Sequence, residues 1–111
     1  MITFKDSMKL EITKTTGRLL IPSSILKSDN EFKHYVKMKV GSRNGKVYFI
    51  PEKNFDKVDL DADSFDLIKD NKIDKQGKIS ISSKIVKELK LTSKKYMLTA
   101  IDNKYIIMGE I

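Results

Sequence analysis

The chain has 111 residues, enough for one domain or two very small ones, and its 22 lysines and arginines outnumber its 15 aspartates and glutamates to give a net charge of +7. The absence of cysteine excludes disulfides and cysteine-ligated zinc, and the single histidine excludes a metal site built from several histidines. The short apolar runs exclude a transmembrane helix and the N-terminus lacks the apolar core of a signal peptide, so we expect a soluble, cytoplasmic protein.

The first half of the chain reads as four strands and one short helix. Met8, Leu10 and Ile12 alternate with polar residues, which is typical of a half-buried strand. Pro22 stands where a helix can begin, and Asn44-Gly45 favours the positive φ of a tight hairpin turn. In chain order we expect a strand at 8–12, a turn at 15–17, a strand at 19–21, a helix at 23–27, a strand at 36–40, a hairpin loop at 41–45 and a strand at 47–50.

Residues 52–71 form an acidic segment between two basic ones. They carry three basic and seven acidic side chains, a net charge of −4, whereas residues 1–51 carry +6 and residues 72–111 carry +5. The apolar residues of this acidic segment fall near helical spacing, yet 59–63 alternates strictly. An amphipathic helix and an extended segment therefore both stay open, and we expect the end of the segment to supply a strand before Lys75.

The carboxylates of the acidic segment allow two roles. A calcium loop needs a central glycine and a terminal glutamate, which the segment lacks, so we expect no metal site. The acidic face could instead dock a protein partner or mimic DNA, and the candidate partner-binding residues are Asp59, Asp61 and Asp63.

The second half repeats the order of the first. The expected elements are a strand at 79–81, a helix at 83–89, a strand at 96–101, a turn at 102–103 and a strand at 104–108. Ile12 falls over Ile73, and after a one-residue gap before Gly17 residues 17–27 align with 77–87 at an offset of 60. Further on, Tyr35 falls over Tyr96 at an offset of 61. The glycine that opens each motif suits a turn with positive φ, and the two tyrosines are expected in the core or at a barrel end.

Two short motifs connect the chain to a known family. The first is Gly-Arg-Leu-Leu-Ile-Pro at 17–22 and the second Gly-Lys-Ile-Ser-Ile-Ser at 77–82. Each follows a lysine, Lys14 or Lys75, and precedes a short helix with a basic residue. The pair resembles the AbrB-type swapped-hairpin regulators of the SpoVT/AbrB superfamily, in which two such halves interlock their hairpins into one DNA-binding β-barrel.

This resemblance implies a mostly β fold with short α elements. Two β-β-α-β-β repeats, 1–51 and 72–111, would be joined by an acidic linker at 52–71 and form one single-chain, pseudo-dimeric swapped-hairpin barrel. The chain would act as a monomer that is itself a pseudo-dimer, or pair further as a homodimer. The second copy has Ser82 in place of Pro22, and this divergence argues for an asymmetric rather than a palindromic target.

The expected partner is double-stranded DNA. Basic residues of both halves can neutralise phosphates, and Arg18 can fork onto O6 and N7 of guanine, which a lysine does less specifically. Lys27 and Lys87 are expected to contact phosphate, which positions a protein without reading sequence. The candidate DNA-binding residues are Lys14, Arg18, Lys27, Lys75, Lys78, Lys84 and Lys87. The sequence thus predicts a sequence-preferring, non-catalytic DNA-binding protein, a transcriptional regulator without a cofactor.

Two alternatives remain open. The same barrel and the acidic segment could serve a protein-interaction module, such as an antitoxin-like protein or a phage-type inhibitor. The lysines could also be ordinary solvated surface residues in a chain from an AT-rich genome. An enzyme is not expected, because no acid, base and nucleophile stand at plausible spacing, and the serine pairs at 23–24 and 82–83 read as helix starts.

Overall fold

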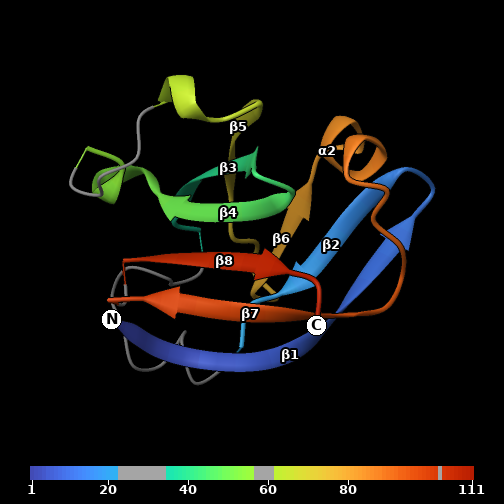
Figure 1. Ribbon diagram of the computed structural model, residues 1–111, viewed down its shortest axis with the longest axis horizontal. Coiled ribbons are helices and arrows are strands. Elements are labelled where there is room, and N and C mark those ends of the chain that lie inside the picture. Colours follow the sequence, from blue (N-terminus) through green and yellow to red (C-terminus); the bar gives the residue numbers. More distant parts are fainter. Residues whose placement is uncertain (23–34, 57–61, 103) are drawn as a thin grey trace.

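All eight predicted strands are present in a computed structural model, which describes residues 1–22, 35–56, 62–102 and 104–111 (Figure 1). The strands are β1 (Ile2–Thr13), β2 (Thr16–Leu20), β3 (Lys37–Arg43), β4 (Lys46–Pro51), β5 (Leu67–Lys72), β6 (Lys78–Ile81), β7 (Lys95–Ile101) and β8 (Tyr105–Gly109). The described chain also holds the α-helix α2 (Ser83–Glu88) and the 3-10 helices η2 (Glu52–Asn54) and η3 (Ala62–Ser64). The prediction of a mostly β fold with short α elements is confirmed.

The strands form one sheet that curls into a nearly closed barrel, in the order β5-β3-β4-β8-β7-β1-β2-β6. β5 and β6 stand at the two ends of this order although they follow each other in the chain. Within the described residues these two strands share no backbone ladder, but the Asn71 side-chain amide on β5 donates to the Ser80 carbonyl on β6 at 2.7 Å. A side chain therefore bridges the seam where the barrel would close.

Strands from the two halves of the chain alternate in pairs around the barrel. β1 and β2 lie between β7 and β6, while β3 and β4 lie between β5 and β8. If β1, β2, β3 and β4 are exchanged for β5, β6, β7 and β8, in that order, the β1–β7 pair becomes the β5–β3 pair. The β2–β6 and β4–β8 pairs stay the same under this exchange. Neither half can therefore bury its strands without the other, and both belong to one core.

Exchange of the two halves of the chain keeps one residue pair of the ladder between β2 and β6, Leu19–Ile79, in place. The pairs of this ladder are, in order, Gly17–Ile81, Arg18–Ser80, Leu19–Ile79 and Leu20–Lys78. Positions related across the Leu19–Ile79 pair differ by 60 residues, which is also the offset between the two sequence motifs. The division into two repeats with a linker at 52–71 stays a prediction. β5 begins at Leu67, at the end of that segment, where a strand before Lys75 was expected.

Fully buried residues of every strand but β5 fill the barrel, and the partly buried Leu67 of β5 packs against them. Leu10, Leu19, Ile79 and Ile81 are at most 1% exposed, as period-2 alternation on a curled sheet requires. Further members of the same cluster are Ile21, Met38, Val40, Val47, Phe49, Ile73, Ile85, Val86, Tyr96, Leu98, Ala100, Ile106 and Met108.

The acidic segment packs on the outside of the barrel. Phe65 covers Tyr48 in an edge-to-face contact with ring centroids 5.4 Å apart, and Phe55 lies beside Phe65 at 6.3 Å. A single amphipathic helix over this segment is wrong, because its described residues form η2, η3 and the start of β5. Backbone pairing of β5 with β3 and the two aromatic anchors override the helical spacing.

Two details of the predicted repeat are wrong. The first turn lies at Lys14-Thr15, so Gly17 already belongs to β2 and lacks positive φ, whereas Gly77 has φ +81°. Tyr96 is buried in β7, but Tyr35 precedes β3 and is 61% exposed, so the offset of 61 does not join equivalent positions. The predicted helix at 23–27 lies outside the described residues.

Candidate nucleic-acid interface

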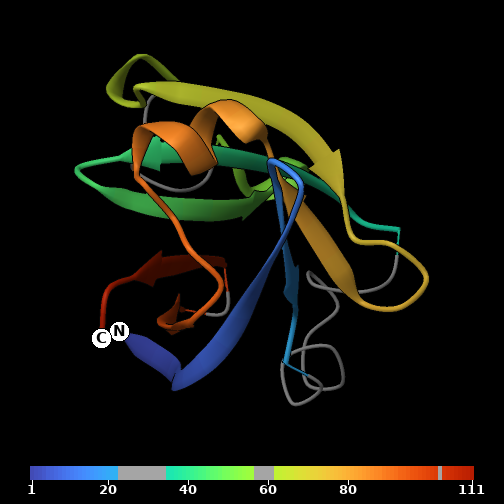
Figure 2. The same ribbon diagram turned by 90° about the vertical axis from the view of Figure 1, so that its right-hand side faces the viewer.

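The paired strands β2 and β6 present a polar surface to solvent. Gly17, Leu19, Ile79 and Ile81 point into the barrel and are buried. Side chains alternate along a strand, so the residues between them face outward. These are Arg18, Leu20, Lys78 and Ser80, which we call the β2–β6 face. Figure 2 shows this side of the barrel, with α2 above the two strands and the connection from β5 to β6 at the right.

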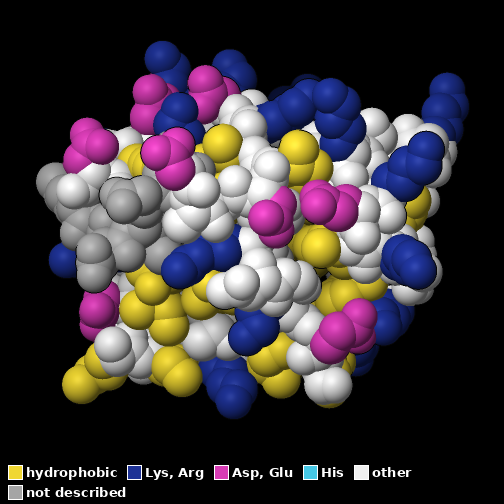
Figure 3. Space-filling model, turned by 45° about the horizontal axis from the view of Figure 1, so that its top comes forward, with side chains coloured by type: hydrophobic (Ala, Val, Ile, Leu, Met, Phe, Trp, Pro, Cys, Tyr) yellow, Lys and Arg dark blue, Asp and Glu magenta, His cyan; other side chains and the backbone are white. Residues whose placement is uncertain are grey.

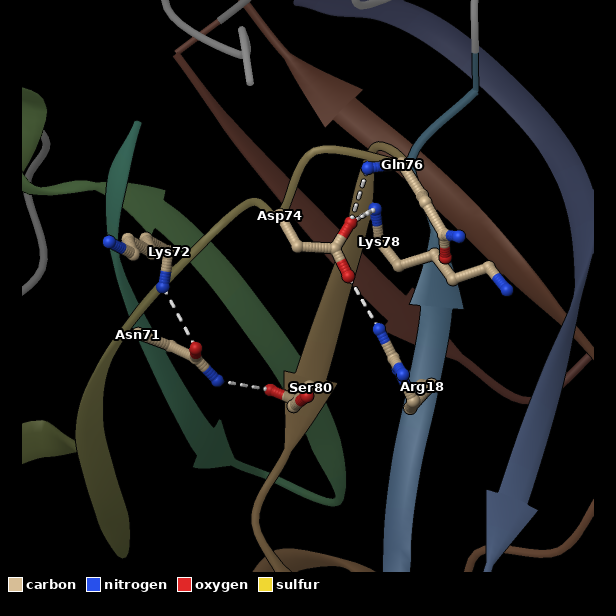
Figure 4. A network of polar contacts seen from close by, with 7 residues as sticks. All are labelled: Arg18, Asn71, Lys72, Asp74, Gln76, Lys78 and Ser80. Atoms are coloured by element: carbon tan, nitrogen blue, oxygen red, sulfur yellow. Dashed lines mark hydrogen bonds and ion pairs between the residues drawn. The ribbon is translucent and has the colours of Figure 1, made fainter. Parts of the chain in front are cut away.

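Arg18 on this face is bound by an acid from the other half of the chain. Its Nη2 lies 2.5 Å from Oδ2 of Asp74, which stands in the connection between β5 and β6. The second carboxylate oxygen, Oδ1, accepts the backbone N–H groups of Gln76 at 2.8 Å and of Lys78 at 2.9 Å. Figure 4 shows these contacts converging on one carboxylate, which is therefore oriented by its own loop.

The protonation of Asp74 reflects the same contacts. The Lys78 N–H is the main cause that lowers the pKa of this carboxyl, with help from the Gln76 N–H and the Arg18 guanidinium and against a smaller opposing effect of burial. The pair is only partly shielded, since the side chains of Arg18 and Asp74 are 43% and 34% exposed. Asp74 is therefore ionised at neutral pH, and its partner remains open to a ligand.

A groove of about 700 Å³ lies between the β1–β2 turn and α2. Four lysines line it, namely Lys14 from the turn, Lys84 and Lys87 from α2, and Lys90 just after the helix. Its remaining lining residues are Ile12, Thr15, Ser83, Val86, Leu91 and Thr92. We call this the lysine groove. Figure 3 shows basic side chains gathered at the upper right, where Figure 1 places α2 and the β1–β2 turn.

Local sequence explains how α2 presents its lysines. The Ser82 hydroxyl accepts the N–H of Ile85 and caps the helix start. At the other end Lys90 has φ +53°, and the Leu91 N–H donates to the Val86 carbonyl at 2.9 Å, as in a Schellman termination. Ile85 and Val86 are buried, so the lysines of this short helix remain on its exposed side.

The structure brings part of the predicted set of DNA-binding residues together. Lys14, Lys84 and Lys87 share the lysine groove, and Arg18 and Lys78 lie on the β2–β6 face. Lys75 is exposed in the connection between β5 and β6. Lys27 and the candidate partner residues Asp59 and Asp61 lie outside the described residues, while Asp63 is exposed in η3.

Two residues of the site were not singled out from the sequence. Lys90 comes three residues after Lys87 and so falls on the same side of a helical turn, a spacing that could have identified it. Asp74 stands three residues before Gly77, which is typical of a loop capped by an aspartate. Its contact with Arg18 spans 56 residues and depends on the interlocking of the two halves.

Within the described ranges, His, Asp and Glu side chains nowhere form a group of three that could hold a metal ion. No helix among the described residues has the length and apolar character needed to cross a membrane. The chain matches no model of a known protein family and no curated protein.

Proposed function

We propose that this chain is a sequence-preferring double-stranded DNA-binding protein of the AbrB type, a non-catalytic transcriptional regulator that acts in the cytoplasm at the nucleoid. The observation that carries the proposal is the lysine groove beside the β2–β6 face. Four lysines, from the β1–β2 turn, from α2 and from the residues just after it, line one hollow, and an arginine lies on the neighbouring strand pair.

Electrostatics makes a polyanion the best ligand for this surface. Double-stranded DNA carries one negative charge per ~1.7 Å of axis, and each phosphate that a lysine neutralises releases condensed counterions. The molecule measures 31 × 30 × 25 Å, so one side of it spans roughly nine base pairs at about 3.4 Å each. The lysine groove and Arg18 can therefore contact the same duplex.

The two parts of the surface support different roles. Lysines are flexible point charges and suit phosphates, whose contacts set position but carry no sequence information. The planar guanidinium of Arg18 suits the O6 and N7 atoms of guanine. If Arg18 reads a base, its replacement by alanine weakens binding to a preferred site by about 1–3 kcal/mol.

Binding to random-sequence duplex DNA between about 50 and 200 mM salt tests the proposal. We expect a log–log slope of roughly −4 or steeper, which corresponds to several neutralised phosphates. The double variant Lys84→Ala/Lys87→Ala should lower the magnitude of the slope by about 1.8, because each lysine contributes about 0.9.

A matched control separates a local site from overall charge. Lys5 and Lys46 border a different hollow, over β1, β4, β7 and β8, and the variant Lys5→Ala/Lys46→Ala has the same net charge as the α2 variant. It should keep the parental slope. Equal losses in both variants would contradict a lysine-groove site. Absence of binding at the lowest salt would contradict DNA binding altogether and favour the protein-interaction alternative. A variant that removes the charge of Asp63 would then begin to test that alternative.

A further inference from the structure

The ion pair between Arg18 and Asp74 connects the two halves of the chain at the centre of the β2–β6 face. Oδ1 of Asp74 is held by two backbone N–H groups, and the Gly77 N–H closes the loop on the Asp74 carbonyl at 3.0 Å. Oδ2 is thereby aimed at Nη2 of Arg18 (Figure 4). The acceptor is set by its loop, so it restrains a side chain that would otherwise sample many rotamers.

The same arrangement is lacking on the symmetric side of the face. When the two halves of the chain are exchanged about the Leu19–Ile79 pair, Lys78 takes the position of Arg18. It also puts the β1–β2 turn in the place of the loop that holds Asp74. The residues of that turn, 13–16, are Thr-Lys-Thr-Thr and include no acid. The described face thus has one arginine fixed by a carboxylate on one side, and a lysine without this arrangement on the other.

The pair is compatible with base readout. A guanidinium carries five N–H donors in one plane, so one edge can stay bonded to Asp74 while another edge forks onto guanine O6 and N7. An exposed ion pair contributes little to folding. Fixing a side chain in its binding orientation, in contrast, reduces the entropy lost on binding and sharpens discrimination between ligands.

We propose that Asp74 is a positioning residue that holds Arg18 for base readout, so that the two sides of the face differ in role. Arg18 supplies the sequence discrimination, and the lysine groove supplies phosphate contacts. This inference rests on the proposed DNA-binding function and extends it by assigning specificity to one side of the face.

The variant Asp74→Asn tests the proposal with little disturbance of the fold. Asparagine keeps an Oδ1 that can accept the N–H groups of Gln76 and Lys78, but it replaces the carboxylate oxygen bound to Arg18 with an amide. Binding is measured for the site that the parent selects from a random duplex pool and for random duplex at the same salt. We expect the ratio of these affinities to fall about fivefold or more, the lower end of what one base-reading pair provides.

The affinity for random duplex should move in the opposite direction. Removing a negative charge beside the DNA reduces repulsion, so Asp74→Asn should bind random duplex at least as tightly as the parent. A disturbed loop would weaken binding to both duplexes, so weaker discrimination together with undiminished random binding points to the position of Arg18. Asp74→Glu, which restores a carboxylate, should recover part of the discrimination.

Asp70→Asn is the matched control. Asp70 forms an ion pair of similar length, 2.6 Å, with Lys39 on the β3–β5 pair, so this variant removes the same charge away from the β2–β6 face. It should keep the parental affinity ratio. Arg18→Ala should lose at least as much discrimination as Asp74→Asn, and the double variant should lose no more than Arg18→Ala.

The experiment distinguishes failure of the positioning role of Asp74 from failure of the proposed DNA-binding function. If the parent binds no duplex at the lowest salt, DNA binding itself is wrong. If the parent binds with a preferred site but Asp74→Asn keeps the affinity ratio within twofold, the positioning role is overturned while DNA binding stands. Equal losses in Asp74→Asn and Asp70→Asn would also overturn it, because the effect would then follow net charge.

Discussion

The two connections that lead into the central strands differ in length, pairing and charge. β1 enters β2 through a two-residue turn, and the ladder between them runs from Thr13–Thr16 to Leu10–Leu19. β5 enters β6 through residues 73–77, and in the described structure no backbone ladder follows. One connection places Lys14 beside α2, and the other places Asp74 beside Arg18.

The difference follows from strand length. β1 has 12 residues and pairs with β7 up to Lys9 and with β2 from Leu10 onward, whereas β5 has only six. β5 pairs with β3 over six residues, and this pairing continues past its end, where the Ile73 N–H donates to the Val36 carbonyl at 3.1 Å. β5 is thus held by β3 rather than by β6, and the seam relies on Asn71 and on the loop around Asp74. Both connections lead into the same ladder, whose buried pair, Leu19 and Ile79, joins one strand of each half.

The largest expected effect comes from breaking this shared centre. Leu19 is fully buried, and Leu19→Ala should lower the free energy of unfolding by about 2–5 kcal/mol, through lost burial and the cavity that remains. The neighbouring Leu20, 44% exposed, serves as the control and should change stability by less than about 1 kcal/mol when replaced by alanine. Urea denaturation measures both, and the parent should unfold in one transition.

Equal effects of Leu19→Ala and Leu20→Ala would contradict this assignment of the shared core. Two separate transitions in the parent would mean that the halves fold independently, which the strand order argues against.

A smaller effect distinguishes the two glycines of the motifs. Gly77 has φ +81°, so Gly77→Ala should destabilise the protein by about 1–2 kcal/mol, the strain of a left-handed residue with a Cβ. At Gly17 an added Cβ would make contacts at 3.4 Å with Leu10, Ile81 and Val86, and φ is not positive. Gly17→Ala should therefore lower the free energy of unfolding by less than Gly77→Ala, as measured by thermal or urea denaturation. The reverse order would mean that packing against α2 outweighs turn strain.

The smallest expected effect is a pH dependence of the connection around Asp74. Its pKa in the folded protein is lowered, so its contribution to stability is complete above the unfolded value of about 3.9 and is lost as the pH falls through the lower folded value. Because the pair is partly exposed, this contribution should stay below about 1 kcal/mol. The difference in unfolding free energy between the parent and Asp74→Asn should therefore shrink below about pH 4. If this difference were the same at pH 7 and at pH 3, the account would be contradicted.

Much of the fold was accessible from local patterns. Alternation such as Met8-Leu10-Ile12 marks strands because one face of a sheet must be buried, and Ser82 marks a helix start because its hydroxyl satisfies a free N–H. The lysine groove was partly predicted, since Lys84 and Lys87 follow the motif that resembles the AbrB type. Gly17 was misread as a turn residue because a glycine looks alike in a turn and in a crowded strand.

The pattern of apolar residues and turn residues by itself determined the eight strands and the short helix α2, and the charged residues determined the basic character of two of the three chain segments. These features depend on neighbours within a few positions, and local physics is enough to specify them. Only the tertiary structure decided which strands pair across the barrel, that the acidic segment packs through Phe55 and Phe65, and that Asp74 meets Arg18. Those contacts join residues far apart in the chain, and they form only because two halves that cannot bury their sheets alone close around one core.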